Sequence, residues 1–79
     1  MTLQYIPDLI YDAGPSGFAE LIMNLLLKMK NLERGQIIEV ITYDPSAIED
    51  LLAWCRMQNY TLLDHKNFGS SSYYYIEKR

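Results

Sequence analysis

Apolar residues recur at helical spacing from Phe18 onward, and this is the strongest pattern in the chain. A spacing of three or four residues puts apolar side chains on one face of a helix. Lys28, Lys30 and Arg34 follow the pattern toward its end, where cations complement the helix dipole. We predict a helix that starts at Phe18 and is capped at its C-terminus by Gly35. Its apolar face consists of Phe18, Leu21, Ile22, Leu25, Met29 and Leu32.

A second helix is predicted to begin at Asp44-Pro45. Asp accepts hydrogen bonds from free N–H groups at a helix start, and Pro fits the first helical position because its missing N–H is not needed there. Asn59 is suited to end this helix in a left-handed conformation. The predicted buried stripe consists of Ile48, Leu51, Leu52 and Cys55.

Four segments have the composition of strands. Residues 3–13 predict an edge strand, because Pro7 cannot donate to a sheet ladder. Residues 36–43 are almost continuously apolar and β-branched, which favours a central strand. Residues 61–66 and 72–77 predict two more strands, joined by a turn at 67–71.

The order of these elements, β-α-β-α-β-β, predicts the fold class. Right-handed crossovers put both helices on one face of a four-stranded mixed sheet. We therefore expect a single α/β (α+β) two-layer sandwich domain over residues 1–79, with the other sheet face open.

Seven tyrosines make this open face a candidate surface. Alternation along the last strand points Tyr73 and Tyr75 to one face and Tyr74 to the other. Tyr5, Tyr11 and Tyr43 extend the first set in this interpretation. The pattern is also typical of ordinary strand preference and core packing. The functional alternatives are a protein-binding or homodimer surface, and a platform that stacks RNA bases.

Charge and composition exclude several classes of protein. The net charge of −3 and the pI of about 4.9 argue against nucleic acid as the main partner. Cys55 is the only cysteine, which rules out an internal disulfide and fits a reducing compartment. No signal peptide or membrane-spanning run is present in the sequence, so we expect a cytoplasmic protein. His65 has no Cys/His cluster around it, and we expect no metal site and no cofactor.

The turn from Gly14 to Phe18 leads from the first predicted strand into the first predicted helix. Backbone N–H groups and the positive end of a helix dipole stabilise an anion or a thiolate there. However, the turn carries no Cys, His, Lys or acid. Ser16 is its only hydroxyl, and we interpret it as a turn or N-cap residue.

Several motifs in a common register resemble the TusA/SirA-like (YedF-like) sulfur-carrier family. Asp12-Ala13 resembles the start of its Asp-Ala-x-Gly-x-x-Cys-Pro-x-Pro signature. The other matching segments are Gly35, Asp44-Pro45, Asp50-Leu51, Ala53-Trp54-Cys55, Asn59-Tyr60-Thr61-Leu62-Leu63 and Tyr75-Ile76-Glu77-Lys78. The resemblance covers residues 12–78 and implies a fold similar to the C-terminal domain of translation initiation factor 3.

The same register implies that the catalytic motif is missing. The family's persulfide-carrying Cys falls at Phe18, its two prolines at Ala19 and Leu21, and its Gly at Pro15. In the family this Cys passes sulfur to a partner, toward tRNA thiolation or other sulfur metabolism. We therefore expect no catalytic residue, and a module that interacts with or regulates other proteins, sulfur-transfer proteins among them. The expected binding residues are Ser16, Gly17, Phe18, Met23, Tyr73 and Tyr75.

Two alternatives stay open from the sequence. Cys55 could carry sulfur in place of the missing thiol, although its place on a buried stripe indicates a structural role. Met23, Leu26 and Leu27 broaden the apolar surface of the first helix. This breadth fits either a docking patch near Phe18 or a deeply packed helix.

Overall fold

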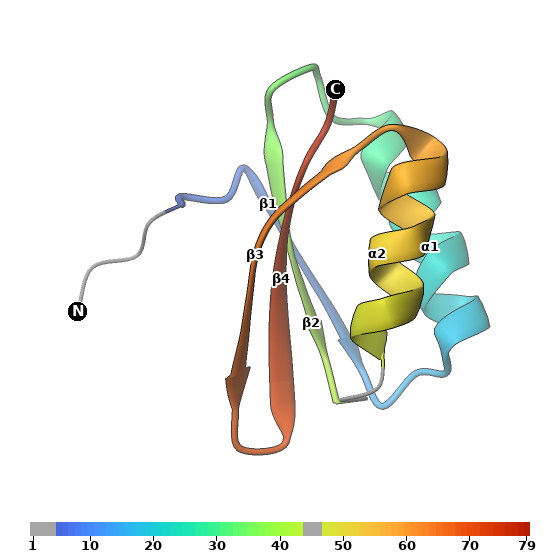
Figure 1. Ribbon diagram of the computed structural model, residues 1–79, viewed down its shortest axis with the longest axis vertical. Helices are drawn as coiled ribbons and strands as arrows, with labels where there is room; N and C mark the ends of the chain where they lie inside the picture. The colour runs from blue at the N-terminus through green and yellow to red at the C-terminus, as the bar shows by residue number, and fades with distance from the viewer. Residues whose placement is uncertain (1–4, 44–46) are drawn as a thin grey trace.

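The computed structural model describes residues 5–43 and 47–79 of the chain. The elements follow the predicted order β-α-β-α-β-β, and they form two layers (Figure 1). They are β1 (Leu9–Gly14), α1 (Phe18–Lys30), β2 (Ile37–Thr42), α2 (Ala47–Gln58), β3 (Thr61–Phe68) and β4 (Ser71–Glu77). Within the described residues, no helix is both long and apolar enough to cross a membrane.

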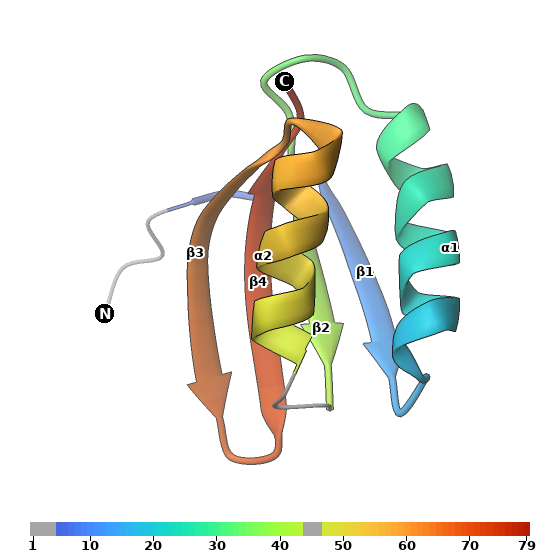
Figure 2. The ribbon, with the colours of Figure 1, turned by 45° about the vertical axis from the view of Figure 1, so that its right-hand side comes forward.

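The sheet has the strand order β1-β2-β4-β3, which confirms the mixed sheet. β1 runs parallel to β2, whereas β4 is antiparallel to both β2 and β3. β1 is an edge strand and β2 is central, as predicted from Pro7 and from the β-branched run. Figures 1 and 2 show both helices on the same side of the sheet, so no helix of the described residues covers the opposite face.

The core lies between the helices and the covered sheet face. α1 contributes three buried side chains at helical spacing, Leu21, Leu25 and Met29. From α2, Leu51 and Cys55 are buried as predicted, but Leu52 is exposed and Trp54 is buried instead. Because each helical residue turns by about 100°, Leu52 lies about 100° from Leu51, at the border of the stripe. The sheet contributes Ile38, Val40, Tyr74 and Ile76.

The prediction that Gly35 caps α1 is wrong. The helix ends at Lys30, and Asn31 is its C-cap. Leu32 stays buried beyond this end, which extends the apolar pattern without extending the helix. Gly35, with a φ of +89°, lies in the turn before β2, and its N–H donates to the Lys78 carbonyl oxygen at 2.8 Å.

The predicted bounds of the other elements need smaller corrections. β1 begins at Leu9 rather than at residue 3, and residues 3 and 4 lie outside the described residues. β3 extends to Phe68, which shortens the turn before β4. Asn59 has a φ of 65°, so its predicted left-handed conformation after α2 is confirmed. The predicted start of α2 at Asp44-Pro45 lies outside the described residues.

The tyrosines are divided between the two faces of the sheet. Tyr11 pairs with Val40, which in turn pairs with the fully buried Tyr74, so all three face the helices. Placing Tyr11 on the open face was therefore wrong, because the parallel register of β1 and β2 aligns it with the core. The ring of Tyr5 lies 6.1 Å from that of Tyr75 on the open face.

Candidate functional site

The turn between β1 and α1 is a compact segment held by local hydrogen bonds. Gly14 has a φ of +57°, a conformation that glycine adopts without steric cost. Its N–H donates to Oδ1 of Asp12 at 2.9 Å, and the N–H of Ser16 donates to the Ala13 carbonyl oxygen at 3.1 Å. These bonds reverse the chain within a few residues and set the direction in which α1 begins.

The N-terminus of α1 holds no nucleophile. Gly17 is the N-cap residue, and no side chain forms a capping hydrogen bond there. Ser16 is thus a turn residue rather than the N-cap. Phe18 is the first residue of the helix, and Glu20 places a carboxylate in the first turn. That carboxylate interacts favourably with the positive end of the helix dipole, but it repels a second anion at the same end.

Phe18 and Met23 differ in their exposure. Phe18 is half-buried and packs against the core, as does Leu26. Met23 is 68% exposed and Leu27 is 58% exposed. Since residues four apart lie on one helix face, Met23 and Leu27 form an exposed apolar stripe. One part of the broad apolar surface of α1 thus packs against the core, and the other part is exposed to solvent.

Cys55 lies in the core rather than at a reactive surface. Its side chain is 1% exposed, in the last turns of α2. Burial raises the pKa of its thiol to about 11, because a thiolate loses its hydration there. The negative end of the α2 dipole also disfavours a thiolate. This environment is typical of an inert structural cysteine.

On the open face, Tyr75 and Tyr73 are covered to different degrees. Tyr75 is only 4% exposed, and burial raises the pKa of its phenol to about 12, with a further contribution from the Glu39 carboxylate. Tyr73 is half-buried and makes an edge-on contact with Phe68, at a centroid distance of 5.5 Å. Phe68 itself is well exposed, so it offers more ring surface than Tyr75.

A polar cluster on the covered face was missed by the sequence reasoning, which takes His65 as an isolated side chain. The His65 ring stacks on Tyr74 at 4.9 Å, and its Nε2 lies 3.1 Å from Oδ1 of Asn67. The same Oδ1 accepts a hydrogen bond from Oγ of the buried Ser72 at 2.7 Å. Because His65 and Ser72 both bond Asn67 rather than each other, they do not form the base–nucleophile pair of covalent catalysis.

Metal binding has no candidate in the described parts of the chain. Among residues 5–43 and 47–79, no three His, Cys, Asp or Glu side chains are grouped so that they could hold an ion.

Comparison with known proteins identifies sulfur-carrier relatives. A family model described as sulfurtransferase TusA matches residues 20–78. The chain is 31% identical over 75 residues to sulfur carrier protein TusA of Pseudomonas putida (strain W619), across 95% of this chain and 94% of that protein. It is 32% identical over 71 residues to putative sulfur carrier protein YrkI of Bacillus subtilis (strain 168), across 90% and 95%. The family match begins at Glu20, just after Phe18.

Proposed function

The chain belongs to the TusA family, and on that premise we propose that it is a member that binds other proteins without carrying sulfur itself. The observation that carries this proposal is Phe18, an apolar ring at the first position of α1. When Asp12-Ala13 is aligned with the family's Asp-Ala, the family's Cys falls at this residue. A phenyl ring forms no persulfide, so the position is suited to contact and not to sulfur transfer.

The environment of Cys55 supports the same proposal. A sulfur carrier needs an accessible thiolate, and a thiol with a pKa of about 11 is ionised to about one part in ten thousand at pH 7. Its 1% exposure also denies a partner access to the sulfur atom. Cys55 therefore lacks both properties that the family chemistry requires.

The proposed docking surface lies at the N-terminal end of α1. It consists of Ser16, Gly17, Phe18 and Met23. Met23 supplies an exposed, flexible thioether side chain, a type that adapts to different partner surfaces. The relatives are named as sulfur carriers, so the partners proposed for this chain are sulfur-transfer proteins, which it would scaffold or regulate.

The test is capture of partners from the native host with Phe18→Asp and Met23→Asp as baits. We expect both variants to lose the sulfur-transfer proteins that the unaltered chain retains, because a carboxylate in an apolar contact loses its hydration. Met57→Asp is the matched control, since Met57 is an exposed methionine on α2. Met23→Asp guards against misfolding, because its side chain is exposed whereas Phe18 packs on the core. Unchanged capture by both variants would overturn the docking surface.

A carrier role for Cys55 is tested separately by mass spectrometry. The chain is incubated with a cysteine desulfurase and cysteine, and the mass of the peptide that contains Cys55 is measured. We expect no gain of a sulfur atom, because the thiol is buried and protonated. Addition of one sulfur at Cys55, followed by its transfer to an acceptor, would replace this proposal with the carrier function.

The open sheet face offers less support for RNA binding. Base stacking needs accessible aromatic rings next to cationic side chains. Tyr75 is 4% exposed, which leaves little of its ring for a base. The net charge of −3 also opposes binding to a phosphate backbone.

A further inference from the structure

Cationic side chains gather at one end of this acidic chain. Lys30 ends α1, Arg34 follows it, and Lys78 and Arg79 come directly after β4. These are four of the seven lysines and arginines in a chain whose net charge is −3. Figures 1 and 2 show that the end of α1 and the C-terminus lie opposite the turn that precedes α1. The cluster is thus remote from Phe18.

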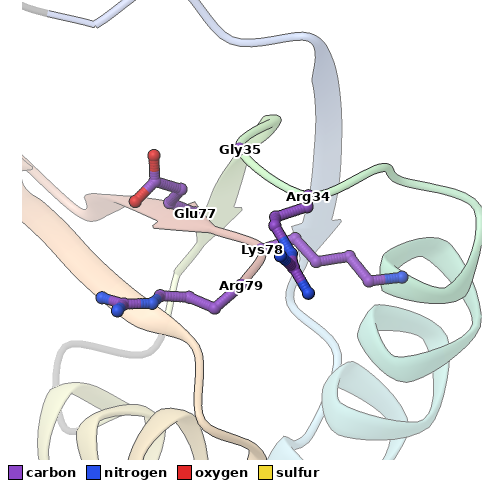
Figure 3. A pocket seen from close by; sticks show the side chains of 5 residues that line it. All are labelled: Arg34, Gly35, Glu77, Lys78 and Arg79. Atoms are coloured by element: carbon purple, nitrogen blue, oxygen red, sulfur yellow. The ribbon is translucent and has the colours of Figure 1, made fainter.

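A hollow of about 340 Å³ opens within this cluster. Figure 3 shows the residues that line it, Arg34, Gly35, Glu77, Lys78 and Arg79. Three of them are cations and one is an anion, so the lining carries a net positive charge. A volume of this size admits a small ligand or one group of a larger one.

The backbone around the hollow is fixed by hydrogen bonds. The N–H of Gly35 donates to the Lys78 carbonyl oxygen at 2.8 Å, and the N–H of Lys78 donates to the Gln36 carbonyl oxygen at 2.9 Å. Nζ of Lys78 donates to the Met29 carbonyl oxygen at 2.8 Å, near the end of α1. This contact offsets the negative end of the helix dipole, which would otherwise repel an anion.

The two arginines are not neutralised by carboxylates in the described part of the chain. Arg34 has no hydrogen-bond or ion-pair partner among those residues. Nη1 of Arg79 donates to the Thr61 hydroxyl at 3.0 Å, a partner that carries no opposing charge. Guanidinium groups present paired donors that match the oxygens of a phosphate.

We propose that the hollow between Arg34, Gly35, Lys78 and Arg79 binds the phosphate group of a small ligand. Among the described residues, no aromatic side chain lines the hollow, so a nucleobase finds no stacking partner there. The recognised group is therefore the phosphate, whether it comes from inorganic pyrophosphate or from a nucleotide. The Glu77 carboxylate, which also lines the hollow, disfavours extended polyanions, and this distinguishes the site from a nucleic-acid groove.

The experiment is an NMR titration of the full chain at constant ionic strength, with pyrophosphate and ADP as separate probes. We expect saturable shifts of the backbone amides of Gly35, Lys78 and Arg79. The double variant Arg34→Gln/Arg79→Gln should weaken binding by about tenfold or more, because it removes both guanidinium groups. Lys66→Gln, on β3, removes one cation outside the hollow and should leave the affinity unchanged.

Each outcome of the titration decides a specific point. Equal affinity for the two probes supports recognition of phosphate alone, and tighter binding of ADP supports a nucleotide source. Shifts that grow linearly with probe concentration would overturn the site, since they report only screening of surface charge. Unaltered binding by the Arg34→Gln/Arg79→Gln variant would also overturn it. The spectra themselves report whether each variant is folded.

Discussion

Phe18 and Cys55 occupy opposite environments for a sulfur atom. Phe18 begins a helix, where the dipole and the backbone N–H groups lower the pKa of a thiol. Cys55 lies in the core near the other end of a helix, where burial raises the pKa to about 11. The chain therefore has a position suited to a reactive thiol, but its only thiol lies elsewhere. The difference in thiol reactivity between the two environments can be measured by placing a cysteine at position 18.

Phe18→Cys should create a reactive thiol in a chain that otherwise lacks one. At pH 7.5 we expect iodoacetamide to modify the new thiol at least about tenfold faster than Cys55, because the helix N-terminus stabilises the thiolate. Site-resolved mass spectrometry measures both rates in the same sample. Met57→Cys is the control, since it places an exposed thiol at the C-terminal end of α2. Faster modification of Cys55 than of either new thiol would contradict the assignment of environments.

Tyr75 should make the fold sensitive to alkaline pH. Burial raises its pKa from 10.0 to about 12, so the folded state favours the neutral phenol more than the unfolded state does. Its contribution to stability is complete below pH 10 and is lost as the pH rises toward 12. Urea unfolding at pH 9, 10 and 11 should show a smaller loss of stability for Tyr75→Phe than for the unaltered chain. Because Cys55 titrates in both proteins, its contribution cancels in the comparison. The same fall in the free energy of unfolding with pH in both proteins would contradict this role of Tyr75.

At the scale of elements, two glycines at element boundaries differ in conformation. Gly35 has a φ of +89°, whereas Gly17 has a φ of −67° and an empty space where a Cβ would lie. Gly35→Ala should therefore destabilise the fold by about 1 kcal/mol. Gly17→Asp should stabilise it by about 0.3 kcal/mol, because the carboxylate caps the free end of α1 against a small repulsion from Glu20. Urea unfolding measures both changes. A change of the same sign in the free energy of unfolding of both variants would contradict the different conformations assigned to Gly17 and Gly35.

The elements could be predicted because the core selects regular spacings, but their ends could not. Leu32 continues the apolar period of α1 although the helix has already ended, since a side chain in the next turn also reaches the core. Leu52 is exposed and Trp54 is buried, although the spacing predicts a buried Leu52. Both residues flank Leu51 on the helix surface, and spacing alone does not decide which of them faces the core. Spacing thus indicates which helix face is buried, whereas tertiary packing decides which residues at the edge of that face are buried and where the helix ends.

The face occupied by His65 could not be read from alternation alone. The pairing of β3 with β4 shifts register between Leu62 and Asp64. A shift of one residue moves every following side chain to the other face. With uninterrupted alternation from Leu62, His65 would lie on the open face, but after the shift it pairs with Tyr74 on the covered face. The polar cluster with Asn67 and Ser72 is a consequence of this irregularity.

At the scale of the whole molecule, the two ends present different chemistry. The N-terminal half of α1 offers the apolar Phe18 and Met23, whereas the opposite end of the molecule offers Arg34 and Arg79 around a hollow. The two-layer fold separates these ends by the length of α1 (Figure 2). Sites that share no contacts make energetically independent contributions. A protein partner and a phosphate ligand should then bind without affecting each other.

This independence is tested by exchanging the variants between the two assays. Phe18→Asp should leave the pyrophosphate affinity within about twofold of the original value, because distant sites are additive to about 0.5 kcal/mol. Arg34→Gln/Arg79→Gln should leave the capture of sulfur-transfer proteins within the same margin. If the arginine variant lost its protein partners, the cationic end would belong to the docking surface, and the hollow would serve acidic groups of a partner. If Phe18→Asp alone altered pyrophosphate binding, the two ends would be coupled through the fold.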